Sequence, residues 1–389
     1  MLALLCPGQG SQTPGMLAPW LEVEAVADRL RWAAAITGLD LISLGLTGDD
    51  ESVRDTANAQ PLLVALALAT ATAITSDTAG PSVVAGHSVG EFAAASLAGA
   101  LTPEVALVLV RERGALMAAA SRMTPTGMSA VLGGEAEDVQ RTLDRLDLVA
   151  ANVNGAGQVV AAGRLDALGR LAAVPPESAR VRSLSVAGAF HTAHMESARA
   201  GLAERAAGAP TADPTRIVVS NADGAVVNNG RELLRRLVDQ VAAPVRWDQC
   251  MQTMSQLGVT AVIELPPAGT LVGLVRRSMP GVETLAIKTP DDLVAARALI
   301  EQHAEVAAGV APSWRLAIAP VAGTFRPSSL DLGTNIEPGT SVGVVVSQSR
   351  ESDVSAAHGG VIVEWLAEDG DPVTPGQPIA LLHPEPTPV

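Results

Sequence analysis

Short apolar runs alternate with longer Ala/Leu-rich stretches through the first 300 residues, and this alternation limits the possible fold more than any other feature of the sequence. Runs of strand length occupy residues 2–5, 82–85, 159–162, 217–220 and 261–265. Stretches of helical length and composition occupy residues 61–75, 90–98, 103–120 and 231–242. Strands that are separated by helices favour an α/β architecture built on a mainly parallel sheet.

Residues 127–186 repeat this alternation in shorter units. The pattern predicts, in order, a strand at 129–133, a helix at 137–146, strands at 149–152 and 159–162, a helix at 166–173 and a strand at 180–186. This β-α-β-β-α-β order is ferredoxin-like. We therefore expect a small subdomain at 127–186, inserted into a large subdomain made of residues 1–126 and 187–300.

The C-terminal part of the chain has a different character. A helix over residues 290–308 is expected to lead into a linker, and the domain boundary is placed at residues 301–318. Short Val-rich runs broken by Gly and Pro follow at 341–346, 360–365 and 378–382. This pattern is typical of an all-β domain, which we place at residues 319–389.

Composition excludes several classes of protein. The 389 residues are 48% hydrophobic, and the net charge of −15 argues against a broad contact with nucleic acid or anionic membrane. The two cysteines, Cys6 and Cys250, cannot form a disulfide framework and have no metal-ligand spacing. The N-terminus lacks a basic leader, and the longest apolar stretch, 61–75, is shorter than a membrane-spanning helix needs. We expect a cytoplasmic protein.

The strongest local signal is the segment Gly86-His87-Ser88-Val89-Gly90, which follows a strand-like run and precedes a helical pattern. This is the G-x-S-x-G nucleophile elbow in its expected context. The small residues allow a sharp turn that presents the Ser88 hydroxyl at the start of a helix, where the Val89 N–H could bind an oxyanion. The alternative is a tight glycine turn in which Ser88 only caps the helix.

A nucleophilic serine needs a base, and the chain has six histidines. His87 is inside the elbow, with its side chain expected to point away from Ser88. Three others lie in the polar helix before the linker or in the tail: His303, His358 and His383. His191 and His194 remain, and His191 is the better candidate because it follows a strand-like run and a glycine turn. A structural histidine is the alternative.

Several segments, taken in their order along the chain, resemble those of malonyl-CoA:acyl carrier protein transacylases, most closely the actinobacterial type. They are Pro7-Gly8-Gln9-Gly10-Ser11-Gln12, Gly86 to Glu91, Arg111-Glu112-Arg113-Gly114, residues 152–160, Ala189-Phe190-His191, residues 240–247 and residues 264–269. The resemblance extends from residue 1 to about residue 295. It implies an α/β-hydrolase-like large subdomain around the inserted small one, and a serine acyltransferase that needs no metal or redox cofactor.

The resemblance also implies roles for individual residues. Ser88 would attack the malonyl thioester and His191 would accept its proton, oriented by the backbone carbonyl of Gln240. The N–H groups of Gln9 and Val89 would form the oxyanion hole. Arg113 would bind the malonyl carboxylate, which a guanidinium can hold bidentately.

Two further positions favour malonyl over a branched extender unit. Phe190 matches the A-F-H form of the histidine segment, and Val89 replaces the Gln that is typical of methylmalonyl-type sequences. The expected partners are therefore malonyl-CoA and the phosphopantetheine thiol of a holo acyl carrier protein, in fatty-acid or polyketide biosynthesis.

The tail resembles the biotin carboxyl carrier (biotinyl/lipoyl) module, which implies a flattened β-barrel of two similar halves. The matching segments are residues 319–325, 341–346, 359–364 and 368–379. Ser349 stands where the modified lysine belongs, and the only lysine of the chain is Lys288. Neither biotin nor lipoate is therefore expected on the tail. A docking or oligomerisation module is the favoured interpretation, and a domain that only covers an exposed face of the enzyme is the alternative.

Docking of an acidic carrier protein would need a positive patch on this acidic chain. Two arginine clusters are candidates, Arg231 with Arg235 and Arg236, and Arg276 with Arg277; a solvated helical face is the alternative for each. Two other functions stay open. One is a thioester hydrolase on the same fold, with water as the acceptor, and the other is a non-catalytic scaffold.

Overall fold

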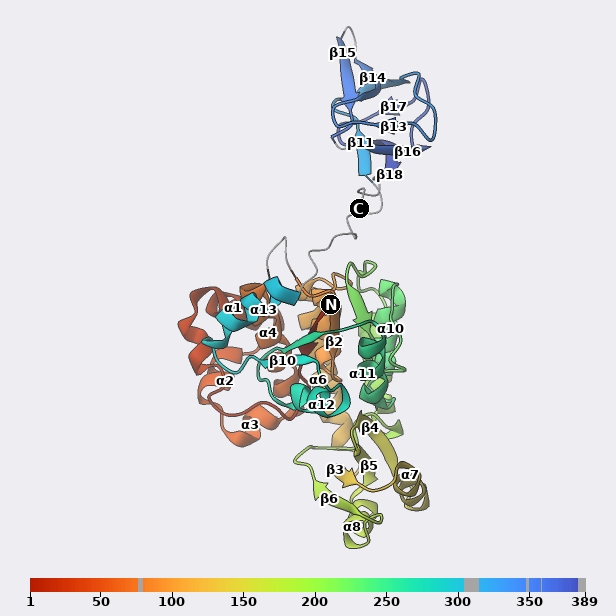
Figure 1. Cartoon of the computed structure of the whole chain (residues 1–389). Helices are drawn as coiled ribbons and strands as arrows, with labels where there is room; N and C mark the ends of the chain where they lie inside the picture. The colour runs from red at the N-terminus through yellow and green to blue at the C-terminus, as the bar shows by residue number, and fades with distance from the viewer. Residues whose placement is uncertain (76–79, 304–314, 348–349, 358, 384–389) are drawn as a thin grey trace. The chain divides into compact units, whose positions relative to one another are not determined.

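The computed structural model describes residues 1–75, 80–303, 315–347, 350–357 and 359–383 (Figure 1). The chain divides into two compact units, Met1–Val306 and Ala307–Val389. Each unit has its own hydrophobic core, so each is described by itself.

A five-stranded parallel sheet forms the centre of the first unit. Its order is β10 (Glu283–Ala286), β9 (Ala261–Glu264), β1 (Leu2–Cys6), β2 (Val83–Gly86) and β7 (Ile217–Val219). The three central strands are entirely buried, which explains why their sequences are apolar apart from Glu264 at the end of β9. The four strands expected for this sheet are confirmed, each to within one residue at either end. The short strand β10 was not predicted.

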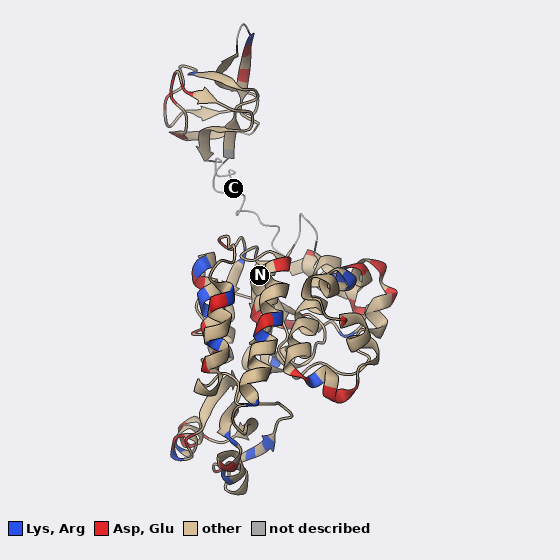
Figure 2. Cartoon of the chain, turned by 180° about the vertical axis from the view of Figure 1, so that it is seen from behind, with Lys and Arg blue, Asp and Glu red and all other residues tan. Residues whose placement is uncertain are grey.

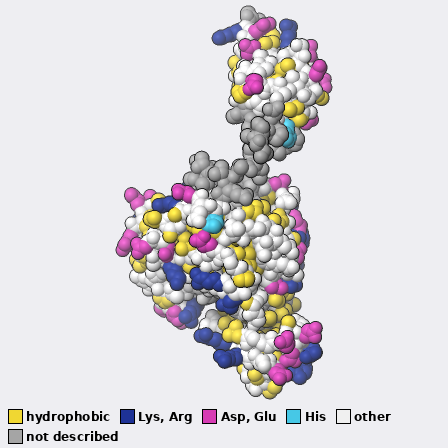
Figure 3. All heavy atoms as spheres, viewed as in Figure 1, with side chains coloured by type: hydrophobic (Ala, Val, Ile, Leu, Met, Phe, Trp, Pro, Cys, Tyr) yellow, Lys and Arg dark blue, Asp and Glu magenta, His cyan; other side chains and the backbone are white. Residues whose placement is uncertain are grey.

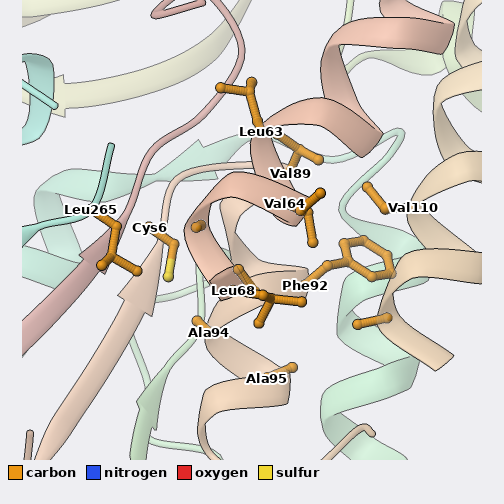
Figure 4. Close-up of a cluster of buried hydrophobic side chains, with 14 of the residues drawn as sticks. Cys6, Leu63, Val64, Leu68, Val89, Phe92, Ala94, Ala95, Val110 and Leu265 are labelled. Carbon is orange, nitrogen blue, oxygen red and sulfur yellow. The ribbon is translucent and has the colours of Figure 1, made fainter. Parts of the chain in front are cut away.

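Helices surround this sheet and form most of the apolar core. They are α1 (Glu24–Thr37), α2 (Leu41–Thr47), α3 (Asp50–Arg54), α4 (Thr56–Ile74), α5 (Gly90–Leu97), α6 (Pro103–Ser121), α9 (Glu196–Ala206), α10 (Gly230–Asp239), α11 (Trp247–Gln256), α12 (Thr270–Ser278) and α13 (Asp292–His303), with two 3₁₀ turns at Ala18–Glu22 and Ala193–Met195. Figure 4 shows part of this core, where Leu63, Val64 and Leu68 of α4 lie near Phe92 of α5 and Val110 of α6. The nucleophile elbow therefore leads into a fully packed interior.

Helix α4 differs from the sequence expectation. It begins at Thr56, five residues before the expected start, because the Asp55 side chain caps it by accepting the N–H of Ala57 at 2.8 Å. Pro61 therefore lies inside the helix, not at its first turn. With 19 residues, α4 is long and apolar enough to cross a membrane, but 78% of its apolar window is buried inside this fold. It is a core helix here.

The small subdomain has the expected order of elements. Its strands are β3 (Thr126–Gly133), β4 (Val149–Gly155), β5 (Gln158–Arg164) and β6 (Ala179–Ser183), with helices α7 (Ala136–Arg145) and α8 (Leu165–Ala173). The sheet order β6-β3-β5-β4, with antiparallel pairing, is ferredoxin-like. A fifth strand, β8 (Val245–Arg246), was not predicted; it comes from a distant segment and pairs parallel to β4. This pairing ties the small sheet to the large subdomain.

The second unit is all β, as expected. One four-stranded antiparallel sheet has the order β11 (Arg315–Ile318), β18 (Pro378–His383), β16 (Gly360–Trp365) and β13 (Asn335–Ile336). The other has the order β15 (Arg350–Ser355), β14 (Ser341–Ser347), β12 (Gly323–Pro327) and β17 (Pro372–Val373).

The boundary between the units needs one correction. Strand β11 occupies residues that were assigned to the linker, because Ala317 and Ala319 point into the core while Leu316 and Ile318 are exposed. Helix α13 is described only to His303, so the end of the expected helix at 304–308 lies outside the described residues. Ser349 and His358 also lie outside them.

Candidate active site

Ser88 lies in the turn that joins β2 to α5, with a backbone φ of +53°. The two glycines of the turn are required by contact. A Cβ atom on Gly86 would lie 2.0 Å from the carbonyl carbon of Gly90, and a Cβ on Gly90 would lie 2.2 Å from the carbonyl oxygen of Cys6. The left-handed φ of a non-glycine residue stores strain of about 1–3 kcal/mol. The elbow predicted from the sequence is therefore formed.

His191 lies directly beside the serine. Its Nε2 atom is 2.7 Å from Ser88 Oγ, and its Nδ1 atom is 2.7 Å from the backbone carbonyl oxygen of Gln240. A carbonyl only accepts, so Nδ1 carries the proton and Nε2 accepts the hydrogen bond from the Ser88 hydroxyl. His191 also has a left-handed φ, +61°, so both partners of the pair are held in strained backbone conformations.

The surroundings of His191 keep it neutral. Burial is the main reason, and the positive charge of Arg113 adds to it; together they lower the pKa of His191 to about 3. A neutral imidazole whose Nε2 faces a hydroxyl is the form that a general base needs. The resting site is therefore ready to accept the Ser88 proton.

The low pKa of His191 predicts that the pH–rate profile has no acid limb near the usual histidine pKa. Because the pKa of His191 is lowered, its proton is lost at a lower pH than that of an ordinary histidine. The kcat/KM for acylation by malonyl-CoA should therefore stay level as the pH falls from 7.5 to 5, and steady-state rates across this range would check it. An acid limb centred near pH 6.5, the usual histidine value, would contradict the prediction.

Gln240 ends helix α10 as its C-cap residue. Its buried side chain donates from Nε2 to the carbonyls of Ala243 at 2.7 Å and Pro244 at 2.8 Å. These bonds fasten the loop after the helix and so fix the direction of the Gln240 carbonyl that His191 contacts. The sequence predicted the role of the backbone carbonyl but not that of the side chain.

Arg113 reaches the serine from helix α6. It is only 1% exposed; its Nη2 donates to Ser88 Oγ at 3.2 Å and its Nη1 donates to Gln60 Oε1 at 2.7 Å. Burial lowers the pKa of Arg113 to about 10, so the group stays positive at neutral pH. Its Nε has no hydrogen-bond partner, and no carboxylate of the described residues forms an ion pair with it. A buried cation that lacks a counter-charge can bind an anion beside the nucleophile.

Two backbone N–H groups complete the constellation. Gln9 follows β1 and Val89 follows Ser88, and the last residues of β1 and β2, Cys6 and Gly86, are paired neighbours in the sheet. Neither N–H donates to an acceptor within the part of the chain that the structure describes. The side chain of Gln9 is anchored separately, by donation to Thr56 Oγ1 at 3.3 Å. Both N–H groups are therefore available to a developing oxyanion.

The other histidines and the cysteines have different environments. His87 donates from Nε2 to Asn154 Oδ1 at 2.9 Å, and its ring lies 5.6 Å from that of Trp247. His194 is exposed. Burial raises the pKa values of the Cys6 and Cys250 thiols, which leaves both unreactive. No group of three metal-ligating side chains occurs among the residues that the structure describes.

Sequence reasoning missed three residues of this site. Gln60 holds the Arg113 guanidinium, Asn154 holds the His87 ring, and the buried Asn221 hydrogen-bonds to the elbow backbone. Asn154 was noted as part of a family segment without a role. Gln60 lies in an apolar helical run and Asn221 in a turn-like segment, so neither has a local sequence signal.

A Ser–His pair beside a buried arginine and two unused N–H groups is an arrangement that can support acyl transfer. A family model described as acyl transferase domain matches residues 3–296, and the chain belongs to this family. Among curated relatives, malonyl CoA-acyl carrier protein transacylase of Mycobacterium tuberculosis is 51% identical over 296 residues, which cover 75% of this chain and 98% of the relative. The enzyme of the same name from Bacillus subtilis is 33% identical, over 75% of this chain and 95% of the relative.

Solved structures agree with these relatives. The crystal structure of MCAT from Mycobacterium tuberculosis is 49% identical with a TM-score of 0.74, and the similarity covers 76% of this chain and 99% of that one. A malonyl-transacylase in complex with a type II PKS acyl-carrier protein is 30% identical with a TM-score of 0.72, over 78% of this chain and 99% of that one. The similarity therefore concerns the first unit.

Proposed function

We propose that this chain transfers the malonyl group from malonyl-CoA to the phosphopantetheine thiol of an acyl carrier protein, through a malonyl ester on Ser88. The names of the relatives and the carrier-bound malonyl-transacylase support this assignment. The observation that carries it is Arg113, a buried, incompletely paired guanidinium 3.2 Å from the Ser88 hydroxyl. An acyl group that brings its own carboxylate would supply the missing charge.

The first half of the reaction loads the serine. His191 Nε2 takes the proton of Ser88 as Oγ attacks the thioester carbon, and the carbonyl oxygen becomes an oxyanion held by the N–H groups of Gln9 and Val89. When the tetrahedral intermediate collapses, the carbon–sulfur bond breaks. The leaving CoA thiolate takes the proton from His191.

The second half reverses these roles. The thiol of the carrier's phosphopantetheine arm gives its proton to His191 and attacks the ester carbon. The bond to Oγ then breaks and Ser88 recovers its proton from His191. Gln240 would keep the same tautomer of His191 throughout, because its carbonyl holds the Nδ1 proton. No metal or redox cofactor takes part in this scheme.

A comparison of acceptors tests this function. With malonyl-CoA and holo carrier protein we expect malonyl-carrier to form much faster than free malonate, and with apo carrier, which lacks the thiol, no malonyl-carrier at all. Mass spectrometry of the carrier and quantitation of malonate would measure both. Malonate release at one rate with or without holo carrier would instead identify a thioester hydrolase, and no reaction would leave the scaffold alternative.

We infer that the second unit is a biotinyl/lipoyl-like domain without an attached cofactor. Support comes from its internal repetition. The eight strands β11–β18 form two sheets with the orders β11-β18-β16-β13 and β15-β14-β12-β17. The second order is the first with every strand replaced by the strand four places further along the unit, counting β11 again after β18. Two similar halves are what such a barrel would have. The only lysine of the chain, Lys288, belongs to the first unit, so the tail offers no amine for biotin or lipoate. We propose a protein-binding role for it.

The two arginine clusters considered for carrier docking differ in the structure. Arg235 pairs with Glu232 and Asp239, each at 2.6 Å, and Arg236 pairs with Asp223 at 2.6 Å. Figure 2 shows acidic and basic segments interspersed along the helices. This cluster is therefore largely neutralised.

Arg276 and Arg277, in the last turn of α12, are exposed and form no ion pair with the described residues. Figure 3 shows Lys and Arg side chains gathered on the face of the first unit from which α12 is seen in Figure 1. Of the two clusters, this one keeps its positive charge available, and we propose it as the docking contact for an acidic carrier.

A further inference from the structure

Asn221 makes the most direct contact with the elbow backbone. It lies two residues after β7 and is completely buried. Its Oδ1 accepts the N–H of Ser88 at 2.7 Å, and its Nδ2 donates to the carbonyl of Gly86 at 2.7 Å. One amide therefore binds the peptide groups on both sides of His87, across the turn that presents the nucleophile.

These two bonds bear on the strained residue of the turn. The +53° φ of Ser88 persists only if its surroundings hold it there. The hydrogen bond from the Ser88 N–H fixes the orientation of the peptide group between His87 and Ser88. It therefore restrains φ of Ser88, the backbone angle that determines where the Oγ atom points. It also occupies the Ser88 N–H, which leaves the Val89 N–H as the donor that the elbow can offer to an oxyanion.

Glu91 holds Asn221 in turn. Its Oε1 accepts the backbone N–H of Asn221 at 2.8 Å, from the first turn of α5. Burial raises the pKa of Glu91 to about 8. The hydrogen bond from the Asn221 N–H opposes this rise most, followed by the charges of Arg113 and Arg236, while Asp223 acts in the same direction as burial. The carboxyl is therefore mostly protonated at neutral pH, so it fixes the loop without adding a full negative charge beside Arg113.

We propose that Asn221, itself held by Glu91, is a positioning residue that keeps Ser88 in its left-handed conformation and directs Oγ toward His191. This inference rests on the proposed acyl transfer through Ser88. A side chain at position 221 must supply both a hydrogen-bond acceptor for the Ser88 N–H and a donor for the Gly86 carbonyl, as the two ends of one amide group do. Alanine has neither, and ionised aspartate lacks the donor. A misplacement of about 1 Å at a reacting atom can cost roughly 100-fold in rate.

The test compares Asn221→Ala with the full-length wild type. We expect kcat to fall roughly 100-fold, while KM for malonyl-CoA changes less than about threefold, since Arg113 is untouched. A fluorophosphonate probe, which reacts with activated serines, should label Ser88 more slowly by a similar factor. Asn229→Ala is the matched control: it removes the exposed N-cap of α10 and should lower stability without slowing either reaction.

Glu91 supplies a second pair of variants in case Asn221→Ala does not fold. Glu91→Gln keeps the acceptor for the Asn221 N–H and should retain most of the labelling rate, whereas Glu91→Ala should lose roughly tenfold or more. Equal labelling of wild type and Asn221→Ala, or equal losses in the two Glu91 variants, would overturn the inference. Absence of labelling at Ser88 in the wild type would instead overturn the proposed function, so the two failures can be told apart.

Discussion

Replacing Arg113 by methionine should remove the preference for malonyl-CoA. The substitution keeps much of the side-chain volume but deletes the buried charge, whose hydrogen-bond partners among the described residues are Gln60 and Ser88. Loss of one partner from a buried charge pair costs about 2–5 kcal/mol, so kcat/KM for malonyl-CoA should fall by roughly 30- to several thousand-fold. The rate with acetyl-CoA, which has no carboxylate to pair, should stay level or rise. Measuring both substrates gives the selectivity ratio.

Arg111→Met is the control for that experiment. Arg111 lies on the same helix but is exposed and paired with Glu112, so its loss should change either rate less than about twofold, as is usual for a surface pair. If Arg113→Met lowered the malonyl and acetyl rates equally, Arg113 would act on Ser88 or on the packing and not on the malonyl carboxylate.

Replacing His191 by alanine should nearly abolish transfer. The imidazole is the one base in contact with Ser88 Oγ in the described site, and general-base catalysis contributes typically 10²- to 10⁴-fold. We expect kcat to fall by roughly 10³-fold or more, with a smaller effect on KM, because Arg113, the proposed contact for the malonyl carboxylate, is unchanged. Steady-state kinetics with holo carrier protein would measure it.

His194→Ala is the matched control, since His194 is three residues away and exposed; its rate should equal that of the wild type. Thermal unfolding of both variants separates a loss of chemistry from a loss of fold. A tenfold or smaller loss in His191→Ala would mean that another group takes the Ser88 proton.

The sequence predicted those parts of the molecule that have local signals. Each strand of the parallel sheet that was predicted is a mainly apolar run. Ser88 has a glycine two positions away on either side, because a Cβ at either position would collide with the backbone. Helix α4 was predicted too short because its start depends on a single capping side chain, Asp55, whereas Pro61 gave a stronger but misleading signal.

The parts that were missed depend on tertiary contacts. Asn221 is 133 positions from Ser88 and its short turn has no periodicity, so only the folded chain reveals its bond to the elbow. Gln60 is similar, 53 positions from Arg113. Strand β8 has only two residues, too few for a pattern, and exists because β4 offers it an edge. Charge clusters were ambiguous for the same reason: Arg235 and Arg276 look alike in sequence, but of the two only Arg235 forms ion pairs with carboxylates in the described part of the chain.

The most direct test of the proposed function is to find the intermediate itself. The protein would be mixed with malonyl-CoA alone, quenched with acid within one turnover and digested. The mass of the peptide that contains Ser88 would then be measured by mass spectrometry. We predict a malonyl adduct on Ser88 that disappears when holo carrier protein is added before the quench. An unmodified Ser88 peptide, in protein that transfers malonyl at its full rate, would contradict a mechanism that passes through this serine.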